Sequence, residues 1–141
     1  MARSGWWRYP ARMVHGVHHL AIQCAALERC ERFYREVLGL PVVQRGVGAD
    51  GSERSVWLGL GGGAFLALER AEDPLEGRPW NDSRAGLHLV ALHIGAAERS
   101  AWEARLAAAG VEVVHRTRWT LYLRDPEGNR VGLSHHPEVA P

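Results

Sequence analysis

The sequence repeats itself, and this internal repeat limits the possible folds more than any other feature. Three pairs of segments match in the same order along the chain: Leu20–Ile22 (LAI) with Val90–Leu92 (VAL), Gly39–Arg45 (GLPVVQR) with Gly110–Arg116 (GVEVVHR), and Val56–Leu58 (VWL) with Leu121–Leu123 (LYL). A repeat this regular is hard to obtain by chance, so we expect two copies of one supersecondary unit.

Each copy follows the order βαβββ. In the first copy, Val17–Gln23 alternates as a half-buried strand does, and Ala26–Leu38 has the spacing of an amphipathic helix that stops at Gly39. The expected strands after it are 41–45, Ser55–Leu60 and Ala64–Glu69, with a turn at Gly61–Gly63. The second copy has an expected strand Leu87–Ile94, a helix Ala96–Ala109, and strands Val111–Arg116, Thr117–Arg124 and Val131–Ser134, with a turn at Asp125–Asn129 (DPEGN).

The repeat also predicts the domain organisation. Each copy alone is too small to bury its sheet well, so the two are expected to fold as one domain over residues 14–141. Within it we assign module 1 to about 14–70, a linker to 71–86 and module 2 to about 87–136, preceded by a tail at 1–13. The predicted fold class is α+β: tandem βαβββ modules forming an eight-stranded, cup-shaped sheet with the helices outside.

Alternation divides each predicted strand into two faces. One face is apolar and is expected to pack against the helices, as Leu20 and Ile22 illustrate. The opposite face mixes small residues, aromatic rings and a few polar groups, as a ligand cavity does. We assign this second face to the cup, and it includes His19, Gln23, Trp57, Phe65, Ala67, Glu69, Leu89, His93, Tyr122, Gly132, Ser134 and His136.

Charge and composition exclude several classes of function. The net charge is +1 and there is no basic stripe, so we expect no nucleic-acid partner and no membrane surface. All basic residues are arginines, which excludes Schiff-base chemistry on a lysine. No apolar run is long enough to span a bilayer and the start of the chain does not read as a secretory signal, so a cytoplasmic location is expected.

The other histidines, together with two arginines, are interpreted as structural or surface residues. His18 and His88 fall on the helix-facing side of their predicted strands, and His15, His115 and His135 are expected at the surface or at an edge. Arg124 and Arg130 flank the predicted DPEGN turn and are interpreted as solvated.

The first strand and helix, HHLAIQCAALERCERFYREVLGLPVV, together with RDPEGNRVGLSH near the end, resemble the vicinal-oxygen-chelate superfamily. This superfamily includes glyoxalase I, bleomycin-resistance proteins and extradiol dioxygenases. The resemblance spans roughly residues 15–136, agrees with the tandem modules and implies a homodimer. It specifies the fold more closely than the reaction, because function depends on the site.

In metal-using members, four ligands come from the first and last strands of each module. The corresponding positions here are His19, Ala67, Leu89 and Gly132, of which only His19 carries a donor. One imidazole does not hold a divalent ion against water, so no cofactor is favoured. The alternative is a shifted set of His19, Glu69, His93 and His136 around Ni, Zn, Fe or Mn.

Two function classes follow from these positions. The leading hypothesis is a metal-independent small-molecule-binding protein of the bleomycin-resistance type, whose ligand contacts Gln23, Trp57, Phe65, Glu69, His93, Tyr122 and Ser134. The alternative is a divalent-metal-dependent enzyme, a glyoxalase-like lyase or isomerase or a dioxygenase, that uses the shifted set. A third possibility is a metal-free enzyme in which Glu69 and His19 do acid–base work.

Overall fold

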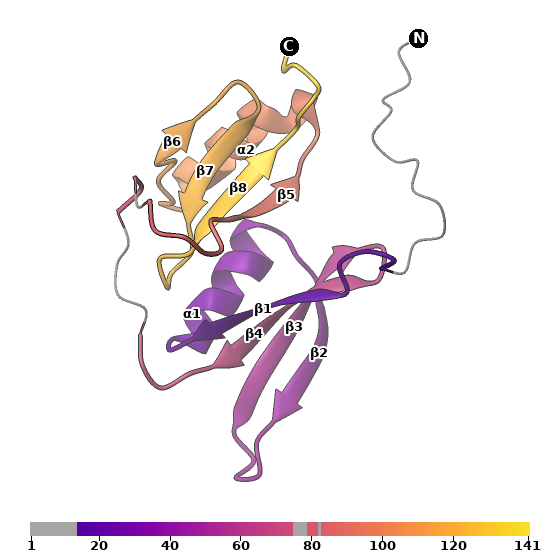
Figure 1. The fold of residues 1–141 in the computed structure, drawn as a ribbon, viewed down its shortest axis with the longest axis vertical. Helices are drawn as coiled ribbons and strands as arrows, with labels where there is room; N and C mark the ends of the chain where they lie inside the picture. The colour runs from indigo at the N-terminus through magenta and orange to yellow at the C-terminus, as the bar shows by residue number, and fades with distance from the viewer. Residues whose placement is uncertain (1–13, 75–78, 82) are drawn as a thin grey trace.

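A computed structural model describes residues 14–74, 79–81 and 83–141. The chain forms two modules, each with a four-stranded sheet and a helix, and the chain runs from module 1 through the linker to module 2 (Figure 1). This confirms the predicted α+β class and the tandem βαβββ organisation. The eight strands lie in two sheets of four, with the strand ladders inside each module. The predicted tail at 1–13 lies outside the described residues.

Module 1 contains a mixed sheet and one helix. Its strands are β1 (His19–Cys24), β2 (Val42–Val47), β3 (Glu53–Gly61) and β4 (Ala64–Arg70), and its helix is α1 (Leu27–Arg32) followed by the π-helical turn η1 (Phe33–Val37). The sheet order is β1-β4-β3-β2, with β1 parallel to β4 and the other pairs antiparallel. The parallel pair is possible because the helix carries the chain back across the sheet.

Module 2 repeats this order. Its strands are β5 (Val90–His93), β6 (His115–Arg116), β7 (Thr120–Arg124) and β8 (Arg130–Ser134), and its helix comprises η2 (Ala96–Glu98) and α2 (Arg99–Ala108). The sheet order β5-β8-β7-β6 matches that of module 1. The register matches too, because Trp57 pairs with Ala67 in module 1 and Tyr122 pairs with Gly132 in module 2.

Several predicted elements differ in length from the observed ones. The helix predicted over Ala26–Leu38 ends in a wider turn, in which the Leu38 N–H donates to the Phe33 carbonyl at 3.0 Å. The strand predicted over Leu87–Ile94 is limited to Val90–His93, because β8 begins only at Arg130 and offers ladder partners from Val90 onward. The edge strand β6 likewise keeps only two of the residues predicted over Val111–Arg116.

The two modules share one hydrophobic core. The side chains that alternate toward the helices are at most 1 % exposed in both central hairpins: Val56, Leu58, Leu66, Leu68, Leu121, Leu123, Val131 and Leu133. They belong to a single cluster with Leu27 and Phe33 of the first helix and Leu106 of α2. The apolar faces of both sheets are thus buried together, as the alternation predicts. We call the opposite face of each sheet its open face.

The DPEGN turn between β7 and β8 joins the modules. The Tyr34 hydroxyl donates to Asp125 Oδ2 at 2.7 Å, and the Ala26 N–H donates to Glu127 Oε1 at 2.7 Å. Burial, together with the neighbouring Asp125 carboxylate, raises the pKa of the Tyr34 phenol well above its usual value. From the other side, Arg105 of α2 donates to the carbonyl oxygens of Val37 and Glu36 at 2.6 and 2.7 Å.

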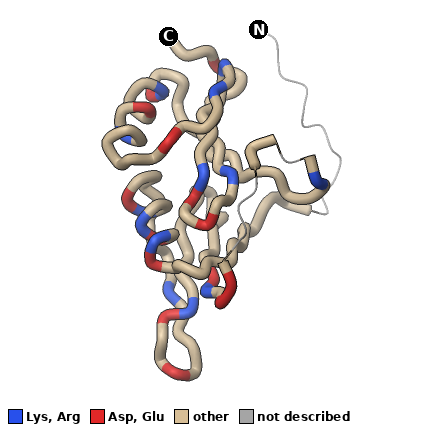
Figure 2. Tube along the Cα trace, turned by 90° about the vertical axis from the view of Figure 1, so that its left-hand side faces the viewer, with Lys and Arg blue, Asp and Glu red and all other residues tan. Residues whose placement is uncertain are grey.

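Charges of both signs are distributed along the trace of both modules (Figure 2). The described part of the chain contains no helix that is long and apolar enough to cross a membrane.

Candidate functional site

The open face of module 1 carries three stacked rings. Phe65 lies in the middle, with the His19 ring at a centroid distance of 4.9 Å and an interplanar angle of 5°. On its other side the Trp57 ring lies at 4.4 Å and 12°. The ladder explains this order, because His19 pairs directly with Phe65 across β1 and β4, and Trp57 of β3 pairs with Ala67, two residues further along β4. We call these three residues the aromatic stack.

The aromatic stack has an accessible end and a buried end. His19 is exposed, and its Nδ1 lies 2.9 Å from Nδ1 of the exposed His18. Phe65 and Trp57 are half-buried, and the Trp57 indole N–H is buried with no hydrogen-bond partner in the described part of the protein. A flat apolar group can therefore extend the stack at His19, and an acceptor near Trp57 would satisfy its indole N–H.

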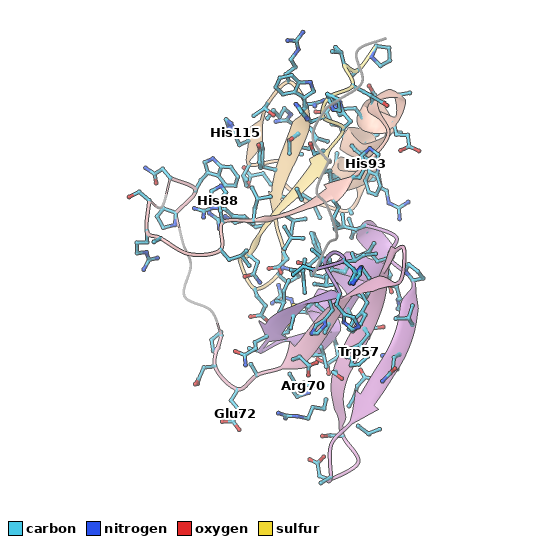
Figure 3. All side chains as sticks on the ribbon, turned by 45° about the vertical axis from the view of Figure 1, so that its right-hand side comes forward. Trp57, Arg70, Glu72, His88, His93 and His115 are labelled. Carbon is cyan, nitrogen blue, oxygen red and sulfur yellow. The ribbon has the colours of Figure 1, made fainter. Side chains whose placement is uncertain are left out.

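The open face of module 2 carries a different aromatic group. Trp80, from the linker, lies against Tyr122 at a ring-centroid distance of 5.2 Å and against His115 at 5.7 Å. His88 completes the group at 6.2 Å from Trp80. Figure 3 shows His88 and His115 on the same side of module 2, with Trp57 down in module 1. The linker thus covers Tyr122, which is the residue that corresponds to Trp57 in the repeat.

Arg130 holds this cover in place. Its guanidinium lies 5.3 Å from the Trp80 ring centroid, and its Nη2 donates to the carbonyl oxygens of Pro79 and Trp80, both at 2.7 Å. Its Nη1 donates to His88 Nδ1 at 3.3 Å. Arg130 is 4 % exposed. The solvated position expected for this residue is therefore wrong, because the linker folds over it.

The other predicted site residues lie apart from the aromatic stack. Gln23 and Glu69 are direct partners across β1 and β4, but they stand four residues along the ladder from the His19–Phe65 pair, or about 13 Å. In module 2, His93 pairs with Ser134, whose hydroxyl accepts a hydrogen bond from Thr120 at 2.9 Å. His93 is exposed, on the opposite side of module 2 from His88 (Figure 3).

The residues at the superfamily's metal-ligand positions do not fit a metal ion. Ala67 and Gly132 are buried and have no donor atom. A Cβ added at Gly132 would stand 3.2 Å from Thr120 Cγ2 and 3.5 Å from Leu89 Cδ1, so apolar atoms already fill this place. In the described residues no group of three or more His, Cys, Asp or Glu side chains is arranged to hold a metal ion.

The shifted ligand set does not assemble either within one chain. Glu69 stands four residues along the β1–β4 ladder from the pair of His19 with Phe65. The exposed His136 ring makes a T-shaped contact with Trp119 at a centroid distance of 4.9 Å. The same separation keeps Glu69 and His19 beyond hydrogen-bonding reach of a shared proton, as the metal-free acid–base alternative would need.

Three histidines differ from their sequence interpretation. The alternation predicts His18 and His88 on the helix-facing side, but they contact aromatic rings on the open faces, because the strands begin only after them. His135 is expected at the surface, but it is 0 % exposed, and its Nε2 lies 3.1 Å from an Arg99 Nη1 donor. The sequence offers two signals for the cover: an aromatic residue in a polar linker, and the alternation that puts Arg130 on the same face as Gly132.

Residues 16–133 match the family model described as Glyoxalase/Bleomycin resistance protein/Dioxygenase superfamily. The chain belongs to this superfamily. Among curated proteins, YwkD of Bacillus subtilis (strain 168) is similar to this member at 29% identity over 100 residues, which are 71% of this chain and 76% of YwkD.

Two solved structures show the same superfamily fold. A glyoxalase/dioxygenase from Nostoc punctiforme superposes with a TM-score of 0.73 at 18% identity, over 88% of this chain and 92% of that one. A point mutant of the fosfomycin resistance protein FosX from Listeria monocytogenes, complexed with Mn(II) and 1S,2S-dihydroxypropylphosphonic acid, superposes with a TM-score of 0.69 at 19% identity, over 87% and 93% of the two chains. At these identities the likeness establishes the fold alone.

Proposed function

We propose that this superfamily member binds a flat, largely apolar small molecule on the open face of module 1 and does so without a metal ion. The aromatic stack carries the proposal, because its exposed His19 end offers a ring face to a ligand. Each aromatic pair contributes about 0.5–1.5 kcal/mol beyond simple area burial, which suits recognition of a planar ring system. Gln23 and Glu69, further along the same ladder, supply polar anchors for the far end of a longer ligand.

The FosX structure contains Mn(II), so the superfamily fold can hold a metal ion in that protein. The present chain has alanine, leucine and glycine at three of the four superfamily positions, and no set of donors replaces them within the described residues. This composition of the site favours binding over lyase, isomerase or dioxygenase chemistry around a divalent ion.

We also propose that the protein is a cytoplasmic homodimer. Strands β1 and β5 stand at the outer edges of their sheets, and outer strands offer free backbone groups for pairing. Exposed valines lie close by, at Val17 before β1 and at Val43 and Val47 on the other outer strand of module 1. Multi-angle light scattering across a range of protein concentrations tests the dimer, and a single-chain mass at every concentration contradicts it.

The binding proposal is tested with the neutral planar probe N-phenyl-1-naphthylamine. Trp57→Ala should weaken the affinity by up to about tenfold, because it removes the ring against which Phe65, and through it His19, is stacked. Trp57→Phe keeps a ring and is the matched control, with affinity close to that of the native protein. Unchanged probe affinity in Trp57→Ala, with native circular dichroism, would overturn the proposed binding face.

Metal independence needs its own measurement. The untagged protein is loaded with Ni²⁺, Zn²⁺, Fe²⁺ or Mn²⁺, and the metal bound per chain is determined by elemental analysis. The expected result is no retained metal after desalting. Near-stoichiometric metal that disappears in His19→Ala would instead support the divalent-metal enzyme.

A further inference from the structure

The guanidinium of Arg130 is buried and carries a positive charge. It is 4 % exposed, and in the described part of the chain it has no carboxylate partner. Its acceptors are two backbone carbonyl oxygens and one imidazole nitrogen, and none of them carries a negative charge. Buried charges in proteins are normally paired, so an unpaired one indicates a missing anion.

The hydrogen-bond inventory of this guanidinium is also incomplete. An arginine offers five N–H donors, and the three observed hydrogen bonds use only part of them. The Nε–H is buried and has no acceptor in the described residues. A buried donor left without a partner is costly, and an incoming oxygen atom would satisfy it.

Arg130 also lines a small cavity. It has a volume of about 50 Å³ and is lined by nine residues, among them Arg130, Arg124, His88 and Asn129. None of these nine described residues is Asp or Glu. The volume is enough for one carboxylate or phosphate group, but it is too small for a whole drug-sized molecule.

A second arginine, Arg124, lies opposite Arg130 in the sheet. Arg124 and Arg130 are direct partners in the β7–β8 ladder, so both side chains leave the same face of the sheet. Arg124 Nη1 donates to the Gly128 carbonyl at 2.9 Å, which fixes its position beside the turn. Both arginines line the cavity, so its wall contains two guanidinium-bearing side chains.

We propose that this cavity at the start of β8 is an oxyanion-binding subsite that takes the carboxylate or phosphate group of a small molecule, with Arg130 as its central donor. The site lies mainly on module 2, with Ile22 of β1 also in its lining, and it does not depend on the ligand proposed for module 1. It supplies positive charge on the same face as Gly132, two residues along β8, where a metal ion does not fit.

The experiment follows the arginine Nε–H signals of the ¹⁵N-labelled protein while sodium acetate or inorganic phosphate is added, with sodium chloride as the ionic-strength reference. The Arg130 signal is identified by its loss in Arg130→Lys. The expected result is a saturable shift of that signal with acetate, phosphate or both, and the anion with the larger response identifies the preferred group. No shift beyond the chloride reference with either anion overturns the proposal.

Thermal stabilisation by the same anions gives a second readout. Arg130→Gln should bind the preferred anion roughly tenfold more weakly or worse, because the charge-assisted hydrogen bond is lost. Arg116→Gln removes an exposed arginine of β6 and should respond as the native protein does. Equal responses in Arg130→Gln and the native protein contradict the subsite, and if Arg130→Gln does not fold, the Nε–H titration decides.

The two proposals fail separately. Trp57→Ala should keep the full response to acetate or phosphate while its affinity for the naphthylamine probe falls. A Trp57→Ala protein that loses both responses would show that the anion acts through the module 1 face, and would overturn the separate subsite.

Discussion

The two modules share their strand order and ladder register, but their open faces carry different aromatic groups. In module 1, Trp57 takes part in a stack of rings that ends at the exposed His19. In module 2 its counterpart Tyr122 is covered by Trp80, which Arg130 ties down. The same strand arrangement therefore carries two different surfaces. Module 1 exposes the His19 end of the aromatic stack, and module 2 buries the Arg130 guanidinium beneath Trp80.

The turns before the last strands also differ between the modules: the turn of module 1 is open, and the turn of module 2 is largely buried. In module 1 the turn at Gly61–Gly63 consists of glycines with positive φ and has open space around it. In module 2 the turn contains Asp125, 4 % exposed, which is hydrogen-bonded to the first helix of module 1. The module with the covered face thus supplies the contact that joins the two halves.

The largest effect is expected at this junction. Asp125→Ala removes the acceptor of four hydrogen bonds, from Tyr34, from the Glu127 N–H and from the backbone and side chain of Asn129. It should lower the free energy of unfolding by about 3 kcal/mol, because several buried donors lose their partner. Urea denaturation followed by circular dichroism measures this change.

The glycine turn provides the comparison for that variant. Gly62→Ala places a Cβ at φ +60° in open space, so only the backbone preference is affected, at a cost of about 1 kcal/mol. If Gly62→Ala is as destabilising as Asp125→Ala, the two turns do not differ in the way described.

The cover on module 2 is the next target. Trp80→Ala should lower stability by about 2 kcal/mol, less than a fully buried tryptophan would, because Trp80 is half-buried. It should also uncover Tyr122 and His115 and so make module 2 resemble module 1. Isothermal titration with N-phenyl-1-naphthylamine should then show about two bound probes per chain where the native protein binds about one. An unchanged stoichiometry would mean that Trp80 is not what distinguishes the two faces.

The smallest expected effect concerns the ion pairs between helix and sheet. In module 1, Glu31 accepts from Arg45 at 2.6 Å and its side chain is 10% exposed, whereas in module 2 the corresponding pair of Arg116 with Glu103 has side chains 56% and 37% exposed. Glu31→Gln should lower stability by about 1 kcal/mol at neutral pH, and Glu103→Gln by clearly less, because exposed pairs are weak.

The pH dependence of Glu31→Gln sharpens this test. The hydrogen bond from Arg45 holds the pKa of the Glu31 carboxyl below its usual value. A carboxyl with a lowered folded-state pKa stabilises the protein above its unfolded-state pKa, and this contribution is lost as the pH falls through the folded-state value. The difference between the urea midpoints of the native protein and Glu31→Gln should therefore shrink as the pH is lowered from neutral to acidic. A constant difference over that range contradicts the assignment.

Most of the fold could be predicted from the sequence because it rests on local patterns. The repeat, the strand alternation and the glycine stops identified both modules and the buried faces, as Val56 and Leu121 show. Strand lengths were less accessible, because the start of β5 is determined by where β8 begins, far along the chain. A homodimer and a cytoplasmic location remain predictions.

The candidate site was less predictable from the sequence. Trp57 and Phe65 were expected on one face, and they are in contact there, but the contribution of His19 to the same stack depends on the β1–β4 register. Trp80 lies in an irregular segment where periodicity carries no information. The alternation places Arg130 on the face of Gly132, but its burial depends on that segment folding back, which is a tertiary effect.

The common core also means that a substitution in one module affects the other. Here the first helix of one copy is bonded to the final hairpin of the other, so a change at Tyr34 is felt across the chain at Asp125. The two copies should therefore unfold together in a single calorimetric transition, despite their separate sheets.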